Sequence, residues 1–316
     1  MKGTDYNQLW IHRLMLSDLV RGEAFRKAIE HTVTPDSIVL DMGAGSGILS
    51  FFAAAAGAKK VYAVERTNIV GLIQELAKSN NLENRIEIIQ SDILQAQLPE
   101  KVDVLVSEWL GPFGVDENLL YPLLVTRDRW LKEGGAMLPE LVTAWMAPAY
   151  DPVLDSDMFF WLSRPYGFNY HAVAHHSANE IRYSQQHLTT ENLLSVAQPM
   201  WRTDLHTFKA TDARQPFQCS LQFRAQREAL MNCIVLWFDA EFPGNTVLLC
   251  GPSAPRNHWG STVCPLERVL QVNNSSQIRV DFTCEFDEIP GRSFSSWNIY
   301  IDGELHEKHT TRNAIT

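Results

Sequence analysis

Short apolar runs alternate with longer mixed segments through the first half of the chain. Runs of about four to eight apolar residues, rich in valine and isoleucine, are typical of buried strands. They predict strands at residues 37–41, 60–64, 86–89 and 102–106. The segment 48–56 is rich in alanine, leucine and phenylalanine and stops at Gly57, which predicts a helix. Strands that alternate with helices predict an α/β fold with a doubly wound parallel sheet.

The pattern changes near the glycine and proline residues between Gly134 and Pro139. Beyond them, apolar and polar residues alternate over 217–223, and the run 233–238 is apolar throughout. Such segments, separated by turns rich in glycine, proline and asparagine, are typical of antiparallel strands. We therefore expect two domains: residues 1–137 with the parallel sheet, and residues 138–316 with an antiparallel sandwich or barrel.

The composition excludes several classes of protein. With 316 residues, 45% of them apolar, the chain can form one large or two medium globular domains. Its most apolar run, residues 48–56, is too short to span a bilayer, and no secretory leader is recognisable, so we expect no membrane association. The net charge of -10 disfavours a nucleic-acid partner and suits cationic partners.

The five cysteines all lie in the C-terminal half and form no C-x-x-C pair. This arrangement favours neither a disulfide framework nor a zinc site, and it suits a reducing, cytoplasmic location. His171, His175 and His176 lack the regular spacing of metal ligands. We therefore expect no metal.

A glycine-rich turn follows the first predicted strand, with Gly43, Gly45 and Gly47 in a G-x-G-x-G pattern. Dinucleotide-binding turns have the pattern G-x-G-x-x-G, and Ile48 stands where its third glycine would fall. S-adenosylmethionine, which carries no phosphate, needs the turn and a carboxylate for its ribose hydroxyls. Glu65 follows at the expected interval of roughly 20 residues, and Asp92, after the strand at 86–89, is placed to accept a hydrogen bond from adenine.

Two carboxylates, Glu108 and Glu117, flank a loop that contains Gly111, Pro112 and Gly114 directly after the strand at 102–106. Such a loop can fold back and direct both acids at one cation. A guanidinium is planar, forked and permanently charged, so a pair of carboxylates is a natural receptor for an arginine side chain. This loop predicts a guanidinium site.

Four segments of the chain together resemble the catalytic core of the protein arginine methyltransferase family, and the resemblance runs over nearly its whole length. They are the N-terminal segment 11–21, the glycine motif 39–50, the two-glutamate loop 107–117 and the segment 257–259, where the family has a Thr-His-Trp loop. The resemblance implies a class I methyltransferase domain with a Rossmann-like sheet, followed by an antiparallel β-barrel. It also implies a helical arm at about 150–180 that docks on a second subunit, which gives a homodimer.

The resemblance also implies the roles of individual residues. The catalytic residues would be Glu108, Glu117, His258 and Asp18, the last two as a pair. The residues that bind S-adenosylmethionine would be His12, Met15, Arg21, Asp41, Gly43, Gly45, Glu65 and Asp92, with Arg21 on its carboxylate and Met15 beside its methyl group. The acceptor would contact Glu108, Glu117, Tyr6 and Trp259.

Some positions depart from the family's pattern. Pro112 and Asp116 stand where tyrosines are common, and Asp116 adds a third acid that we expect to attract cationic segments to the site. The acceptor is expected to be arginine within a peptide or protein. Free L-arginine or another small guanidine remains the alternative, and a catalytically silent dimeric scaffold that binds the cofactor is an alternative of another class.

Overall fold

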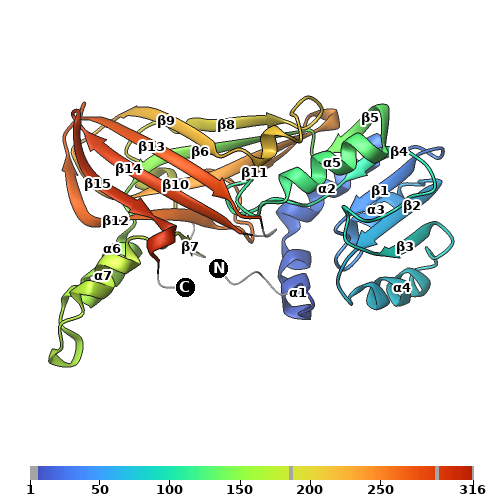
Figure 1. The fold of residues 1–316 in the computed structure, drawn as a ribbon, viewed down its shortest axis with the longest axis horizontal. Coiled ribbons are helices and arrows are strands. Elements are labelled where there is room, and N and C mark those ends of the chain that lie inside the picture. The colour runs from blue at the N-terminus through green and yellow to red at the C-terminus, as the bar shows by residue number, and fades with distance from the viewer. Residues whose placement is uncertain (1–5, 185–187, 289–291, 315–316) are drawn as a thin grey trace.

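The computed structural model describes residues 6–184, 188–288 and 292–314. A parallel sheet with helices on its faces forms one end of the molecule, and antiparallel strands form a barrel at the other (Figure 1). Among the described residues, every helix is too short or too polar to cross a bilayer.

The parallel sheet has the strand order β3-β2-β1-β4-β5. Every position of β1 is buried, as expected for a central strand with both faces covered. Because chain order reverses beside β1, the carboxyl ends of β1 and its neighbours border the crevice where such sheets bind ligands. The strands are β1 (Ile38–Met42), β2 (Lys60–Glu65), β3 (Ile86–Gln90), β4 (Val102–Val106) and β5 (Leu131–Leu138).

Five helices accompany this sheet: α1 (Leu9–Ser17), α2 (Leu19–Thr32), α3 (Ile48–Ala55), α4 (Val70–Ser79) and α5 (Leu120–Trp130). The N-terminal segment 11–21 does not form one continuous helix. It is broken at Asp18, which has φ -79° and ψ 91°. The Asp18 carboxylate accepts a 2.9 Å hydrogen bond from the Arg21 backbone N–H and so caps the start of α2. This break directs Asp18 towards the barrel.

The C-terminal region consists of two antiparallel sheets. Contacts between β8 and β9 and between β12 and β15 bring the two sheets together as a barrel. The first sheet contains β6 (Leu141–Ala149), β7 (Arg182–Ser184), β8 (Gln198–Asp204), β10 (Ala229–Phe242), β11 (Thr246–Leu249) and β12 (Ser261–Val272). The second contains β9 (Phe217–Arg224), β13 (Gln277–Phe286), β14 (Ser293–Ile301) and β15 (Glu304–Thr310). Short 3-10 turns lie at Pro165–Gly167, Thr190–Asn192, Asp212–Arg214, Pro243–Asn245 and Thr311–Asn313.

A helical arm, α6 (Pro152–Leu162) and α7 (His171–Ser177), projects from the barrel (Figure 1). Asp151 caps α6 by accepting a hydrogen bond from the Val153 N–H at 2.9 Å. At the far end of the arm, Phe159, Tyr166 and Phe168 are 70%, 96% and 68% exposed. Large apolar side chains exposed together mark a surface that another protein covers.

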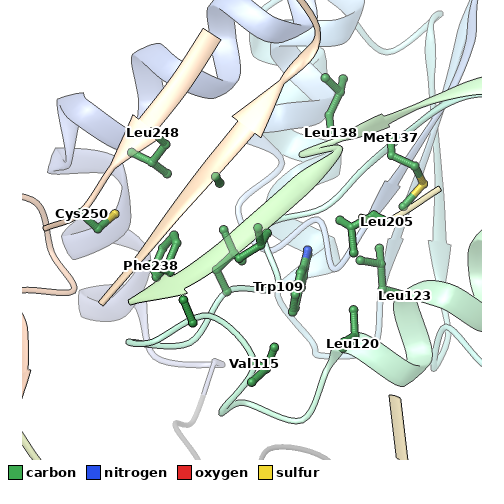
Figure 2. Close-up of a cluster of buried hydrophobic side chains, with 14 of the residues drawn as sticks. Trp109, Val115, Leu120, Leu123, Met137, Leu138, Leu205, Phe238, Leu248 and Cys250 are labelled. Carbon is green, nitrogen blue, oxygen red and sulfur yellow. The ribbon is translucent and has the colours of Figure 1, made fainter. Parts of the chain in front are cut away.

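One continuous core joins the sheet to the barrel. Figure 2 shows its central part, where Trp109 and Val115 of the loop after β4 lie among side chains of α5, β5, β10 and β11. Trp109 and Val115 are 1% and 0% exposed. Because these residues fill the junction, the loop that carries Glu108 and Glu117 is anchored in the core.

Candidate active site

The acidic loop, residues 107–118, connects β4 to α5 and folds back on itself. Gly111 and Gly114 exchange two backbone hydrogen bonds of 3.0 and 2.8 Å, which close a tight hairpin at the tip. Gly114 has a φ of 96°, in the left-handed region that favours glycine. Because the tip folds back, Glu108 before it and Glu117 after it are close enough for their charges to interact.

Tyr6 faces both glutamates. Its hydroxyl donates a 3.3 Å hydrogen bond to Glu117 Oε2. Burial, followed by the charges of Glu117 and Glu108, raises the pKa of the Tyr6 hydroxyl, which therefore stays protonated and remains a donor. The structure thus brings together three residues that the sequence analysis assigned to the acceptor.

Glu108 is held by an arginine and by its own loop. Arg21 places Nη2 at 3.1 Å and Nε at 3.2 Å from Glu108 Oε2. The Leu110 N–H donates to the other oxygen, Oε1, at 3.0 Å. Arg21, expected to hold the cofactor carboxylate, thus forms an ion pair with the acid expected to bind the acceptor. Arg21 therefore lies between the expected cofactor site and the expected acceptor site.

The ionised form of Glu117 is disfavoured in this site. Burial, then the charges of Glu108 and Asp116, raises the pKa of Glu117 to about 8, against a smaller opposing effect of the Tyr6 hydrogen bond. At neutral pH Glu117 therefore favours its protonated form. A cation that enters between the two glutamates restores the charged form, because it replaces their mutual repulsion with attraction.

Asp18 and His258 form a closely hydrogen-bonded pair. His258 Nδ1 lies 2.6 Å from Asp18 Oδ2, and the His258 backbone N–H donates to the same oxygen at 2.9 Å. Burial opposes ionisation of Asp18, but the hydrogen bonds from His258 and Arg21 outweigh it and hold the pKa of Asp18 below its usual value. An ionised Asp18 fixes the orientation of the imidazole, which suits a proton carrier.

The glycine turn leaves room for a ligand at the carboxyl end of β1. Gly43 has a φ of 75°, and a Cβ added there would meet nothing within 4 Å. Gly45 has a φ of 55°, and an added Cβ would lie 3.3 Å from His12 Cε1. Glu65 braces the turn, since Oε2 accepts from the Gly45 N–H at 3.0 Å and Oε1 from the Thr67 N–H at 2.8 Å. The open side of the turn and the imidazole of His12 form a cradle.

Polar atoms around this cradle fit a small polar ligand. Among the residues that the structure describes, the buried atoms His12 Nδ1 and Asp41 Oδ1 have no hydrogen-bond partner. Burial raises the pKa of Asp41 to about 6, with Ser50 Oγ at 2.6 Å from Oδ2 as the main opposing contact. Asp92 Oδ1 accepts from the Leu94 N–H at 2.9 Å, and Met15 lies half-buried on α1. Buried polar atoms need partners, and the hydroxyls, amines and carboxylate of S-adenosylmethionine can supply them.

Trp259 supports the acidic loop from the barrel. It is 7% exposed, and its indole N–H donates to the Leu110 carbonyl oxygen at 3.0 Å. Its ring packs edge-on against Phe238 with centroids 4.9 Å apart. The role expected for Trp259 was contact with the acceptor, whereas the contacts seen here are with the loop that presents Glu108.

Asp116 does not lie where the sequence suggested. We expected it to attract cationic segments from a position beside Glu117, but it is only 7% exposed. Its Oδ1 accepts a 3.0 Å hydrogen bond from the Phe113 N–H inside the hairpin. This hydrogen bond directs the Asp116 side chain into the loop interior, whereas the Glu117 side chain contacts Tyr6.

Several residues that hold the loop were missed from sequence. Ser107 Oγ donates to the Met42 carbonyl at 2.7 Å, and Ser293 Oγ donates to the Asp116 carbonyl at 2.7 Å. Asn118 Nδ2 donates to the Asp287 carbonyl at 2.9 Å. Each partner is far away along the chain, so no local pattern identifies these side chains.

Comparison with known proteins covers both regions. Residues 142–295 match the family model described as the arginine methyltransferase oligomerization subdomain, and residues 26–116 match that of ribosomal protein L11 methyltransferase. Protein arginine N-methyltransferase 6 of Xenopus tropicalis is 32% identical over 296 residues, which cover 91% of this chain and 87% of the relative. Protein arginine N-methyltransferase 1 of Caenorhabditis elegans is 33% identical over 289 residues, covering 88% and 81%.

Solved structures show the same architecture. The Trypanosoma brucei PRMT1 enzyme-prozyme heterotetrameric complex with AdoHcy contains a chain with a TM-score of 0.87 and 26% identity, over 97% of this chain and 99% of that one. Arabidopsis thaliana protein arginine methyltransferase 10 has a TM-score of 0.82 and 25% identity, also over 97% and 99%.

The raised pKa of Glu117 predicts how stability changes with pH. Between its ordinary value of 4.5 and about 8, the folded protein holds the Glu117 proton more tightly than the unfolded chain does. The thermal midpoint should therefore fall as the pH rises from 5 to 8, and Glu117→Gln should make that fall shallower. Asp41 and Asp116 titrate in the wild type and in Glu117→Gln alike, so part of the fall in thermal midpoint should remain in the variant. Parallel curves for the wild type and Glu117→Gln, with exposed Glu83→Gln as control, would contradict this assignment.

Proposed function

The chain belongs to the protein arginine N-methyltransferase family, and on that premise we propose that its acceptor is an arginine side chain within a peptide or protein. S-adenosylmethionine is the methyl donor, in agreement with the family and with the glycine turn and its partnerless polar atoms. The observation that carries the proposal is the placement of Glu108 and Glu117 on one hairpin loop beside Tyr6 and Arg21.

The two glutamates provide the binding energy for the acceptor. At about 4 Å and an effective dielectric near 20, one ion pair contributes on the order of 4 kcal/mol. Because the sulfonium of the donor is also a cation, Glu108 and Glu117 must offset the repulsion between the two substrates. Their negative charge also draws positive charge towards the nitrogens that they contact and leaves electron density on the nitrogen that accepts the methyl group.

The remaining residues surround this centre in defined roles. Gly43 and Gly45 would let the backbone approach the donor, Glu65 and Asp92 would accept from its ribose and adenine, and His12, Asp41 and Arg21 would hold its polar end. Met15 would border the methyl group. S-adenosylmethionine supplies the electrophilic methyl group when bound.

Proton removal completes the reaction. Glu117 gives up its proton as the guanidinium enters, since the cation lowers the energy of the carboxylate. The acceptor nitrogen loses a proton during or after transfer, and we assign its removal to a carboxylate of the loop or to His258, which Asp18 orients. His258 keeps 13% of its side chain exposed and can pass the proton to water.

We also propose a homodimer. The family model that matches residues 142–295 is an oligomerization subdomain, and the arm exposes Phe159, Tyr166 and Phe168. On the cofactor domain, proposed as residues 1–137, α1 exposes Leu9 and Trp10 by 64% and 61%. A two-fold interface in which each arm covers the partner's cofactor domain would bury both apolar surfaces. Free thiols at all five cysteines support a cytoplasmic location.

The acceptor site is tested by replacing each glutamate with its uncharged isostere. Glu108→Gln and Glu117→Gln should each lower turnover on an arginine peptide by on the order of 10²-fold to 10³-fold, the effect of losing one preorganised electrostatic contact. Binding of S-adenosylhomocysteine, measured by calorimetry, should persist. Mass spectrometry after incubation with labelled donor and arginine peptide, its lysine counterpart or free arginine identifies the product. More than a tenth of the activity remaining in both variants, or methylation of free arginine alone, contradicts the proposal.

The dimer is tested by making the arm polar. The triple variant Phe159→Ser, Tyr166→Ser and Phe168→Ser should be monomeric and bind the cofactor more weakly, because the apolar contact with the partner is lost. Leu305→Ser, which alters an exposed leucine on the barrel, is the control. Light scattering of each protein at tens of micromolar provides the measurement. An unaltered protein that is monomeric there excludes the homodimer.

A further inference from the structure

The hairpin of the acidic loop closes around one buried carboxylate. Asp116 Oδ1 accepts the Phe113 N–H at 3.0 Å. A Cβ added to Gly111 would lie 2.5 Å from Asp116 Oδ1 and 2.9 Å from Oδ2, so the carboxylate packs directly against the Gly111 backbone. The side chain of Asp116 therefore fills the inner side of the hairpin that Gly111 and Gly114 close.

The same hairpin is fixed to the barrel on both sides of this carboxylate. The Phe113 ring is 1% exposed and packs edge-on against Phe282 with centroids 6.0 Å apart. The carbonyl of Asp116 accepts the Ser293 hydroxyl at 2.7 Å. Phe113 and Asp116 thus both contact the barrel and also contact each other, and Glu117 is the next residue along the chain.

An ionisable group in this position is unfavourable for folding alone. Burial raises the pKa of Asp116 to about 7, although the N–H groups of Phe113 and of Asp116 itself oppose the shift. The titratable groups that interact with its charge are Glu117 on the loop, Cys264 on β12 and Cys284 on β13. Burial raises the pKa of each of them, and the charge of Asp116 adds to that rise. A buried acid whose charge also disfavours ionisation of Glu117 needs a reason other than stability.

We propose that Asp116 is a positioning residue of the acceptor site, whose carboxylate holds the hairpin so that Glu117 and Glu108 face one guanidinium. This inference rests on the proposed function of the two glutamates. It does not require Asp116 to touch either substrate. Its oxygen gives the Phe113 N–H a partner, and without that partner a buried donor four positions before Glu117 is left unsatisfied.

The charge of Asp116 has a second, separable effect. Because it disfavours ionisation of Glu117, removal of the charge lowers the pKa of Glu117. Activity that depends on ionised Glu117 then extends to lower pH. The hydrogen-bond role and the charge role therefore predict different results for two variants of the same residue.

Asp116→Ala and Asp116→Asn separate these roles. Asp116→Ala removes the acceptor and should lower kcat/KM for an arginine peptide by on the order of tenfold to a hundredfold, mostly through kcat. Asp116→Asn keeps an oxygen that can accept from the Phe113 N–H. Its kcat/KM should therefore be at least about fivefold higher than that of Asp116→Ala. In Asp116→Asn the acidic limb of the pH profile of kcat/KM should move to lower pH, by on the order of half a unit.

Asp103 offers a matched control. Its Oδ2 accepts the Ile38 N–H at 2.9 Å, at the opposite end of the parallel sheet from the acidic loop. Asp103→Ala also deprives a backbone N–H of a carboxylate, so it can lower the thermal midpoint. It should leave kcat/KM and the pH profile as in the wild type. Binding of S-adenosylhomocysteine, measured for each variant, reports whether the cofactor domain is intact.

Three outcomes overturn the inference. They are activity of Asp116→Ala within twofold of the wild type, impairment of Asp116→Asn as severe as that of Asp116→Ala, and an acidic limb in Asp116→Asn that stays in place. If Asp116→Ala fails to fold, the pH profile of Asp116→Asn still tests the inference. If Glu108→Gln and Glu117→Gln stay active while Asp116→Ala does not, the guanidinium site is wrong and the effect of Asp116 on the loop stands.

Discussion

Repulsion between Glu108 and Glu117 is the interaction on which the active site depends. Burial raises the pKa of Glu117 to about 8, and the negative charge of Glu108 adds to this effect. Arg21 neutralises Glu108 through two contacts, whereas Glu117, among the residues that the structure describes, receives a hydrogen bond from the Tyr6 hydroxyl and forms no ion pair. The site thus lacks one cation, and a guanidinium has the charge and the forked shape to supply it.

The two-region architecture keeps these acids in place. The acidic loop leaves the parallel sheet at β4, but Trp109 and Val115 anchor it in the core between sheet and barrel (Figure 2). From the barrel, Trp259 and Ser293 hydrogen-bond to its backbone. Neither region alone provides all of these contacts. The geometry of the proposed acceptor site therefore depends on the junction between the two regions, and the hydrogen bond between His258 and Asp18 also crosses that junction.

Local features could be predicted from the residue pattern, whereas long-range partners were expected only where the family resemblance supplied them. The strand over 102–106 has the predicted bounds, and the glycine turn lies where β1 ends, because both depend on neighbouring residues. The break at Asp18 was missed, whereas the pairing of Asp18 with His258, 240 residues away, was expected from the family resemblance. The expectation that Asp116 attracts cationic segments was wrong. The sequence shows an acid next to Glu117, but it does not show that the hairpin buries this acid against the Phe113 N–H.

The most direct test of a guanidinium site formed by Glu108 and Glu117 is proton release on binding. Calorimetric titration of an arginine peptide into the enzyme with S-adenosylhomocysteine, at pH 7 in two buffers of different ionisation enthalpy, counts the protons exchanged. Because Glu117 is mostly protonated there, binding should release about one proton, and Glu117→Gln should release none. Binding enthalpies that do not depend on the buffer, or equal release by Glu117→Gln, would contradict the account.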